Sequence, residues 1–375
     1  MKKLAVLLAA VMTLSGCIPH PELDRIGIAE AVGVDFDGSV YTVTVQFFNT
    51  DSTGGITAID SSAPNVNISR AGGKTIESAL EELSHRSGHN IMLGSASVIV
   101  FGEGALTDLR DSLDLCVSHY SSNMRAYVCA AEGSAADIMN IRFNEGNASV
   151  EKLKEMIGNS RDLGMSRPVI LYEAAGKLRE PTESAVLPLL RVYGSGSGDT
   201  EEGKSIIIRG GALCVCGSLP ERLTEAETAG LQLLDPGSDG SGDCRVTITH
   251  RGSDIRADMF GIRSRITPSL NGDRLRIDVE ISAHCKLVST SLPDPYAAGT
   301  DMERLCGQEL SERAYTALEA TLKRYGADVV GLSYAIRSQS PEIWETIKDD
   351  YGEYLRNSEI SVSCSVSAER FGLTG

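Results

Sequence analysis

Residues 275–287, LRIDVEISAHCKL, decide the fold of the last third of the chain. Their apolar residues alternate with mostly polar ones, which is the period of a strand with one buried face. Asn271-Gly272, just upstream, is a hairpin turn signal, so residues 262–268 should belong to the partner strand. Within residues 360–368 apolar residues alternate strictly with four serines, which predicts a third strand.

The segment between these strands has helical periodicity. An apolar stripe over about residues 302–325 predicts a long helix that ends at Gly326. We expect residues 327–337 to continue as helix, and Ser340-Pro341 to begin another as N-cap and first helical residue. The order β-β-α-α-α-β predicts a sheet with helices packed on one face.

The first globular residues predict an antiparallel hairpin, in which 26–36 pair with 41–47 across Asp37-Gly38. Apolar and polar residues alternate in the second strand, so we expect one buried and one polar face. An amphipathic helix should run from Ile76 to Gly88. Further strands are expected at 97–101, 125–130, 185–193, 205–216 and 244–250. Further helices are expected at 106–116 and 224–234, and residues 150–177 form a helix-rich stretch.

This alternation predicts a mixed α/β (α+β) fold, with mixed or antiparallel sheets and helices packed on them. The Gly- and Ser-rich residues 194–204 are the clearest break in the chain. We therefore expect three parts after a signal peptide at 1–16. They are an N-terminal α/β domain at 17–193, a middle domain at 194–261 and a C-terminal α/β domain at 262–375, with helices over 302–350.

Residues 1–16 have the pattern of an export signal, with Lys2 and Lys3, a short apolar run and small residues before Cys17. The run is too short to cross a bilayer, which takes roughly 20 residues. Residues 14–17, LSGC, resemble the lipobox of bacterial lipoproteins. That resemblance implies a diacylglycerol on the Cys17 sulfur, cleavage before Cys17, and possible acylation of the new amino group. The alternative is an ordinary secretory signal with a chance cysteine.

The chain is acidic, with a formal net charge of −16, and loss of Lys2 and Lys3 gives −16 − 2 = −18. Such a chain is a poor partner for nucleic acid, whose phosphates need basic patches. Anionic lipid headgroups should also repel it, so acyl chains would have to attach it to a membrane. No other apolar run approaches membrane-spanning length, which predicts a soluble body held at one end.

Nine cysteines are present, and setting Cys17 aside leaves eight. An even number outside the cell permits disulfides. Most of the eight lie in apolar or alternating strand patterns, where a free thiol packs as a small hydrophobe, so we expect mostly buried thiols. Cys285 and Cys364 lie on the inward faces of their strands, and the pattern fits a disulfide and two thiols equally well.

The two motifs that could indicate a catalytic or metal site lack the sequence context that such sites need. Residues 198–205, GDTEEGKS, match the P-loop pattern, but a P-loop needs a helix after it and residues 206–208 are three isoleucines typical of a strand. His85 and His89 are four apart, yet Gly88 ends the helix between them and no further ligand is near. We therefore expect no enzyme activity, no cofactor and no metal.

Four blocks of the sequence carry a family pattern. They are Gly33-Val34-Asp35, residues 73–104 (GKTIESALEELSHRSGHNIMLGSASVIVFGEG), residues 213–234 (LCVCGSLPERLTEAETAGLQLL) and residues 325–355 (YGADVVGLSYAIRSQSPEIWETIKDDYGEYL). Together with the lipobox they extend over nearly the whole chain.

These blocks resemble the C subunits of bacterial spore germinant receptors, the Ger(x)C lipoprotein family. The first is similar to that family's G-[IV]-D motif, and the second has Ser95 where the family often has His. The last is the most specific and resembles D-[IV]-x-G-[FL]-x-x-x-[IV]-x-x-x-x-P-x-x-W, with Asp328, Gly331, Pro341 and Trp344 in place. Ile18 departs from the family, which commonly has Trp after the lipid cysteine.

The resemblance implies a three-part α/β lipoprotein on the outer face of the spore inner membrane. It implies assembly with two integral-membrane subunits into a receptor that responds to nutrients, and no enzymatic role. One rival is a solute-binding lipoprotein that delivers a small ligand to a transporter, which would need a cleft between two lobes. A second rival, an exported hydrolase, finds no nucleophile or metal set in the sequence.

Overall fold

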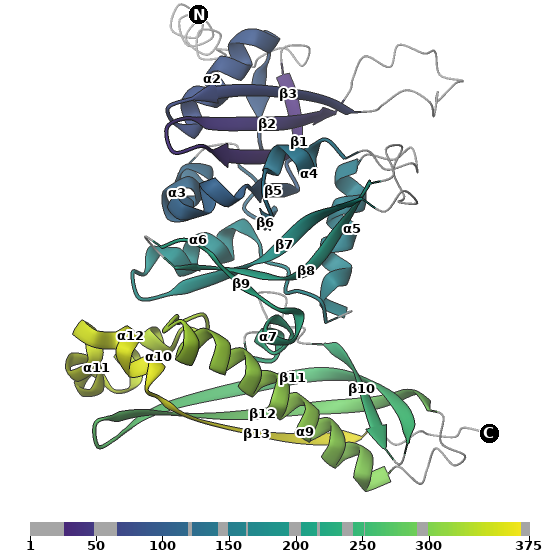
Figure 1. Ribbon diagram of the computed structural model, residues 1–375, viewed down its shortest axis with the longest axis vertical. Coiled ribbons are helices and arrows are strands. Elements are labelled where there is room, and N and C mark those ends of the chain that lie inside the picture. The colour runs from purple at the N-terminus through teal and green to yellow at the C-terminus, as the bar shows by residue number, and fades with distance from the viewer. Residues whose placement is uncertain are drawn as a thin grey trace, which may run out of the picture.

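The protein folds into two β-sheets that lie at different levels of an elongated body (Figure 1). The computed structural model describes residues 26–48, 66–118, 122–141, 149–162, 164–194, 204–215, 218–234, 243–250, 252–290 and 299–368. The signal peptide and Cys17 lie outside these residues. Within the described part, no helix is both long enough and apolar enough to cross a membrane.

The larger sheet has nine strands in the order β3-β2-β1-β5-β6-β7-β8-β9, with β4 paired to one end of β1. Strands β1, β5, β6 and β7 run parallel, and the others pair antiparallel, apart from the parallel β4. The strands are β1 (Ile26–Phe36), β2 (Tyr41–Phe48), β3 (Val66–Gly73), β4 (Asn90–Met92), β5 (Val98–Phe101), β6 (Tyr127–Ala131), β7 (Ser184–Gly194), β8 (Lys204–Val215) and β9 (Glu221–Leu223).

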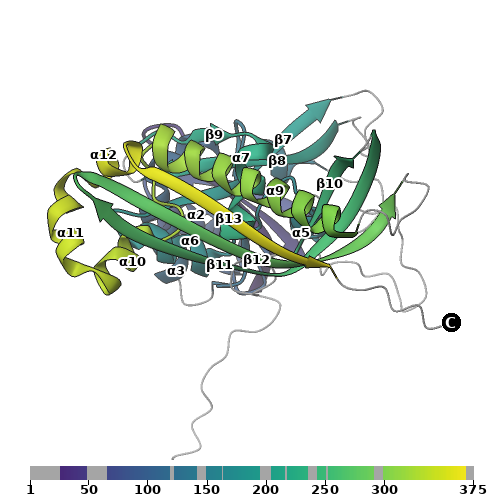
Figure 2. The same cartoon turned by 90° about the horizontal axis from the view of Figure 1, so that it is seen from below.

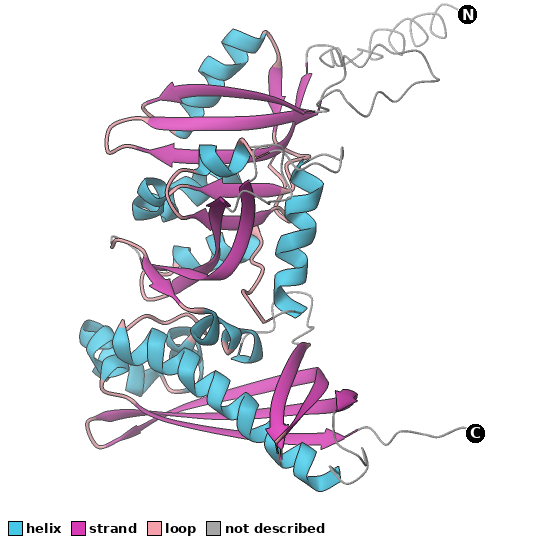
Figure 3. Ribbon diagram, turned by 45° about the vertical axis from the view of Figure 1, so that its right-hand side comes forward, coloured by secondary structure: helices cyan, strands magenta, loops and turns pink. Residues whose placement is uncertain are grey.

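Helices cover both faces of this sheet (Figure 3). One face packs against α2 (Ile76–Ser87), α3 (Leu109–Ser118) and α6 (Leu171–Arg179). The other packs against α4 (Ala135–Met139) and α5 (Ser149–Asp162). Strands buried on both faces explain the continuous apolar run of β5. The mixed α/β fold expected from the sequence is confirmed.

The second strand of the first hairpin corrects one expectation. The hairpin itself is confirmed, but its polar face is not exposed: Thr44 is fully buried and Gln46 is 3 % exposed. Helix α4 covers that face, and the Gln46 side-chain amide donates to the Met139 carbonyl at the end of the helix. A helix from residues 135–139 could not be placed over this strand from local periodicity.

The smaller sheet has the order β10-β11-β12-β13, built from β10 (Cys244–His250), β11 (Ser253–Asn271), β12 (Arg274–Thr290) and β13 (Glu359–Ala368). Gly272 makes the predicted hairpin turn with a φ of 62°. Strand β13 pairs parallel with β12 after a helical crossover. The crossover contains α9 (Gly299–Leu318), a π-helix (Glu319–Arg324), α10 (Leu332–Gln339), α11 (Pro341–Ile347), a 3₁₀ turn (Lys348–Asp350) and α12 (Tyr351–Arg356).

Helix α9 lies along β13, which itself lies between α9 and β12 (Figure 2). At the closest approach a Cβ on Gly307 would come 3.1 Å from the Cys364 carbonyl oxygen. The Glu303 carboxylate also accepts a hydrogen bond from the Ala368 backbone N–H, at 2.8 Å. The helix thereby protects an edge strand that carries no charge between residues 360 and 368.

The predicted helix over 327–337 is wrong in its first half. Residues 327–331 are not helical, Gly331 adopts a left-handed φ of 75°, and α10 begins at Leu332. The Asp328 side chain accepts hydrogen bonds from backbone N–H groups of this turn, which breaks the helical register. Ser340 is the N-cap of α11 and Pro341 its first residue, as expected, although the Ser340 side chain makes no capping bond.

The division into parts at 17–193, 194–261 and 262–375 stays a prediction. In the described residues, β7 and β8 pair antiparallel across the first boundary. Strand β11 runs continuously through the second boundary. The seven cysteines that the structure describes form no disulfide with one another. Six of them are buried and Cys364 is half-buried, so the expectation of mostly buried thiols is confirmed for these.

Candidate functional site

Two of the four motif blocks meet at the carboxyl edge of the parallel strands. After β1 the chain turns to β2 on one side, whereas after β5 it crosses to β6 on the other, so the strand order reverses between β1 and β5. In open α/β sheets this reversal leaves a crevice where ligands bind. Asp35 of the first motif lies one residue before the end of β1, and Gly102-Glu103-Gly104 of the second follows β5.

Asp35 is fully engaged in positioning α4. Its Oδ1 accepts a hydrogen bond from the Ala135 N–H at 2.7 Å. Its Oδ2 accepts from the Ala136 N–H at 3.0 Å and from the Ser134 hydroxyl at 3.1 Å. A Cβ on Gly102 would come 2.0 Å from Asp35 Oδ1, so glycine is required at that position. Both oxygens of the motif carboxylate are therefore used to position the start of α4.

An open crevice of about 440 Å³ lies beside this capped helix. Its polar side chains come from four elements, with Thr42 on β2, Arg70 on β3, Glu103 after β5 and Ser134 before α4. Asp37 completes the rim, and the N–H groups of Val40 and Ser39 lower the pKa of its carboxyl group by hydrogen bonding. The crevice thus contains one cationic and several anionic groups.

An ion-pair ladder borders the crevice. Arg222 on β9 contacts Glu132 and also lies 3.4 Å from the Glu103 carboxylate. Arg191 on β7 lies 2.5 Å from the second oxygen of Glu132. All four side chains are 30 % exposed or more, so solvent screens them and each pair contributes roughly 0–1 kcal/mol. The ladder fixes the orientation of Glu103 more than it stabilises the fold.

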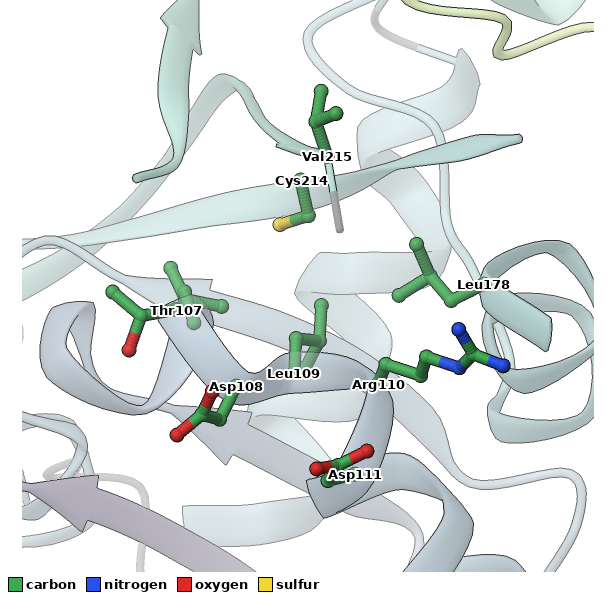
Figure 4. Close-up of a pocket in the computed structure, with 9 residues that line it drawn as sticks. Thr107, Asp108, Leu109, Arg110, Asp111, Leu178, Cys214 and Val215 are labelled. Carbon is green, nitrogen blue, oxygen red and sulfur yellow. The ribbon is translucent and has the colours of Figure 1, made fainter. Parts of the chain in front are cut away.

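A second pocket, of about 190 Å³, lies between α3, α6 and the end of β8 (Figure 4). Cys214 and Val215 lie above Leu109, while the carboxylates of Asp108 and Asp111 point away from the thiol (Figure 4). All of these residues belong to the larger sheet and its helices. This pocket is therefore not the cleft between two lobes that a solute-binding protein would need.

The most specific motif block forms the joint between the two sheets, with Asp328 at its centre. Asp328 is 1 % exposed. Its Oδ1 accepts from the Leu332 N–H at 3.0 Å and the Val330 N–H at 3.2 Å. Its Oδ2 accepts from the Ser333 N–H at 2.7 Å and the Tyr351 hydroxyl at 2.9 Å. Four donors surround one buried carboxylate, which sets the entry to α10.

Three polar contacts tie this turn to the larger sheet. The Ser184 N–H at the start of β7 donates to the Asp328 carbonyl at 2.7 Å. The Lys177 ammonium donates to the Val329 carbonyl at 2.7 Å. Arg337 on α10 donates to Glu180 after α6, at 2.8 Å. Residues 144 to 157 positions apart thus meet in one joint, which the sequence separation conceals.

Burial dominates the electrostatics of the joint. Burial first, and then the nearby Asp328 charge, raises the pKa of the Glu183 carboxyl group. The same two causes, in the same order, raise the pKa of Tyr351, so its hydroxyl stays protonated and donates to Asp328. Trp344 packs edge-on against Tyr351 at 5.3 Å between ring centroids, and the Arg337 guanidinium lies 5.2 Å from the Trp344 ring.

Comparison with known proteins identifies the family. Residues 19–192 match the family described as "Spore germination protein N-terminal domain", and residues 210–372 match "Spore germination B3/ GerAC like, C-terminal". The chain belongs to the Ger(x)C family.

Relatives of this Ger(x)C chain extend over its whole length. It is 21 % identical to "Spore germination protein YndF" of Bacillus subtilis (strain 168), covering 96 % of this chain and 94 % of the relative. It is 20 % identical to "Spore germination protein B3" of the same organism, covering 100 % and 98 %. The crystal structure of the GerBC protein shares the fold, with a TM-score of 0.57 and 17 % identity over 90 % of this chain and 97 % of that chain.

The structure also shows where the other positions singled out in this Ger(x)C sequence lie. Lys204 and Ser205 begin strand β8, which confirms that the P-loop match lacks its helix. His85 lies in the last turn of α2, before Gly88 ends the helix as expected. Ser95, at the family's histidine position, is exposed in the turn before β5. Among the described residues, no group of three or more His, Cys, Asp and Glu side chains could hold a metal.

The amino-acid sequence alone does not reveal the crevice. Thr42 and Arg70 come from strands that only the sheet order brings beside Glu103 and Ser134. No local pattern marks them, because each residue has ordinary polar strand or turn spacing. Cys17, the one site residue that the sequence did predict, lies outside the described ranges and its lipidation stays a prediction.

Proposed function

We propose that this chain is the lipid-anchored, non-enzymatic subunit of a nutrient germinant receptor. Its family has a role in spore germination receptors, and the match over residues 19–192 and 210–372 is the observation that carries the proposal. The subunit would dock with two integral-membrane subunits on the outer face of the spore inner membrane. No nucleic acid is involved, because the chain carries a net charge of −16.

The anchor in this proposal is Cys17. Its sulfur would form a thioether to diacylglycerol, cleavage would free its amino group, and that group can then carry a further acyl chain. Each buried methylene contributes about 0.8 kcal/mol to membrane binding, so two acyl chains anchor the protein stably. The acidic body itself gains no attraction from anionic headgroups. The basic residues Lys2 and Lys3 leave with the signal peptide.

The non-enzymatic part is supported by how the motif carboxylates are used. Asp35 accepts three hydrogen bonds at the start of α4, and Asp328 accepts four around the joint. Both are committed to positioning backbone. Motif residues with these partners serve the shape of a docking body, and a general acid or base would need an oxygen facing solvent or substrate.

Cys17→Ser should release the protein from membranes while its fold persists. Removing the sulfur prevents diacylglycerol attachment, and in cells that lack the two integral-membrane subunits the acidic body has no second means of attachment. Fractionation of membranes at low and high salt, followed by circular dichroism of the released protein, measures both effects. Retention of Cys17→Ser on membranes at high salt would count against the anchor.

A pull-down from spore membranes with the intact lipoprotein tests the receptor assignment. We expect two co-encoded integral-membrane subunits to be recovered. Recovery of an ATP-driven permease in their place would favour the solute-binding lipoprotein and overturn the proposal. Cys17→Ser serves as a second bait, and its comparison with the intact lipoprotein shows whether recovery of the subunits depends on the lipid.

A further inference from the structure

We propose that Cys285 and Cys306 are the partners of a disulfide bond that forms in the exported protein and ties helix α9 to the smaller sheet. Cys285 lies on β12, and Cys306 lies on α9, 21 residues further along the chain. The proposal rests on one part of the proposed function, export to the outer face of a membrane, because disulfides persist where thiols are not kept reduced. It goes beyond that function, which gives these two residues no role.

The two side chains meet between α9 and the sheet, where the structure holds them as two thiols in contact. Both residues are 0 % exposed. Cys306 shares the buried stripe of α9 with Met302 and Leu310, and Cys285 follows Ala283 on the buried face of β12. The Cys306 thiol donates a hydrogen bond to the Cys285 sulfur, which lowers the pKa of the Cys285 thiol. The two sulfurs are therefore already adjacent before any bond forms.

Backbone geometry places this turn of α9 beside Cys285. Cys285 is the register partner of Ala368 on β13. The Ala368 N–H donates to the Glu303 carboxylate at 2.8 Å, and Glu303 lies one helical turn before Cys306. Although α9 packs mainly along β13, its Cα atoms also come within 8 Å of those of β12. A disulfide spans about 4.4–6.8 Å between Cα atoms, so a small movement of the helix suffices to close the bond.

Cys364 is the other cysteine near this contact, and the register excludes it as a partner of Cys285. Cys364 pairs with Ile281 on β12, four residues before Cys285. Four residues of a strand span about 13 Å, which is too far for a disulfide. Cys364 lies close enough to Cys306 to interact with it electrostatically, but the hydrogen bond of Cys306 goes to Cys285. The structure therefore favours the pair Cys285–Cys306.

The bond fastens the middle of α9, which polar contacts hold at its sides. Towards β10, the Asp301 carboxylate lies 3.6 Å from the His250 ring, and the Arg313 guanidinium donates to the Arg245 carbonyl at 3.4 Å. Both contacts reach solvent, so they open more easily than a buried covalent bond does. Holding α9 in place also keeps the uncharged edge strand β13 covered.

Formation of the bond needs an oxidant, which is a protein disulfide or a small-molecule disulfide. One cysteine thiolate attacks that disulfide, forms a mixed disulfide and releases one thiol. The other thiolate then displaces the second thiol and closes the bond between Cys285 and Cys306. In all, the two cysteines lose two protons and two electrons, and the oxidant is reduced to two thiols. Because neither sulfur is exposed in the fold, the exchange takes place before α9 closes over β12.

Peptide mapping of the full-length protein tests the pairing. The protein is isolated from the cells that make it, denatured without reductant, and its free thiols are alkylated. Trypsin leaves the three cysteines of this region in separate peptides, residues 277–286, 305–313 and 357–370. We expect the first two peptides to be joined, with a mass two hydrogens below their sum, and the third to be alkylated at Cys364.

Alanine variants separate the bond from the packing of a small side chain. Reductant should raise the equilibrium constant for urea unfolding of the wild type on the order of a hundredfold, because a loop of about 20 residues is no longer closed. Cys285→Ala and Cys306→Ala should each lose the joined peptides and this dependence on reductant. Cys364→Ala is the matched control, because Cys364 packs against the same apolar cluster, and it should keep both.

A second measurement does not depend on export. The purified chain is unfolded, refolded in glutathione redox buffers and mapped in the same way. We expect the joined peptides to form and to persist when reduced glutathione is in about tenfold excess, as structural disulfides do.

Three results would overturn the proposal. They are unjoined, alkylated peptides in a chain whose Cys17 carries lipid, a bond from Cys306 to Cys364, and no bond between Cys285 and Cys306 in any of the glutathione buffers. The same digest reports the lipid on Cys17. A lipidated chain without the bond refutes the disulfide alone, whereas a bonded chain without lipid refutes the anchor alone.

Discussion

Replacing Asp328 by alanine should destabilise the C-terminal sheet and its joint by about 4 kcal/mol. The carboxylate accepts four hydrogen bonds, and three of the donors belong to the buried residues Leu332, Ser333 and Tyr351. A buried donor left without a partner costs about 1–3 kcal/mol. Three donors give about 3–9 kcal/mol, and relaxation of the turn places the expected value toward the lower end.

The only tryptophan of the chain reports on this site. Trp344 packs edge-on against Tyr351, so its fluorescence should change when the joint opens. Urea unfolding followed at Trp344 gives the free energy of unfolding for wild type and Asp328→Ala. Asp349→Ala is the matched control, because Asp349 is exposed in the 3₁₀ turn between α11 and α12. The control should lie within about 0.5 kcal/mol of wild type.

A double-mutant cycle separates the hydroxyl contact from the rest. Tyr351→Phe removes one donor and should cost about 1 kcal/mol. Asp328→Asn keeps the shape of the side chain but directs an amide N–H₂ at two donors. We therefore expect it to lower the free energy of unfolding by about half as much as the alanine variant does. The two changes should not be additive, because they share one hydrogen bond. An Asp328→Ala cost below about 1 kcal/mol, or equal to that of Asp349→Ala, would refute the reasoning.

Two further outcomes follow from the same structure. Burial and the Asp328 charge raise the pKa of Glu183, so the folded protein binds its proton more tightly than the unfolded chain does. The stabilisation from this proton is present below the unfolded pKa near 4.5 and is lost as pH rises through the raised pKa. Glu183→Gln should therefore flatten the fall in the free energy of unfolding above pH 4.5. An unchanged dependence of that free energy on pH would contradict this. Gly104→Ala should cost about 1–3 kcal/mol in urea unfolding, because its Cβ would meet the Phe36 carbonyl at 2.0 Å. Gly176→Ala on the open surface of α6 should instead stabilise by about 0.5–1 kcal/mol, and equal effects of the two changes would contradict the contact.

Local signals predicted the elements well where the partners are close in sequence. Thr224 forms a capping box with Glu227 at the start of a helix predicted from the sequence, because both groups lie within one helical turn. The β11–β12 hairpin follows from Asn271-Gly272 and strict alternation. The same reasoning placed β13, although its alternating face is only half-buried because it lies at the sheet edge under α9.

Local signals were wrong where a distant group decides the conformation. Residues 327–331 have helical periodicity, yet the Asp328 carboxylate captures the N–H groups that a helix would have used. Thr44 and Gln46 have the spacing of an exposed face, yet α4 buries them. In both cases the deciding contact links residues that periodicity treats as independent.

By itself, the sequence determined the mixed α/β class, most of the strands and helices, the family and the expected anchor at Cys17. These depend on periodicity, turn residues and motifs, which are properties of short segments. The tertiary structure alone decided that Asp35 and Asp328 position backbone, that Ser184 and Lys177 join the two sheets, and that Arg70 and Glu103 line the same crevice. The order of strands in a sheet determines which distant residues come into contact, and that order depends on the burial of apolar surface across the whole chain.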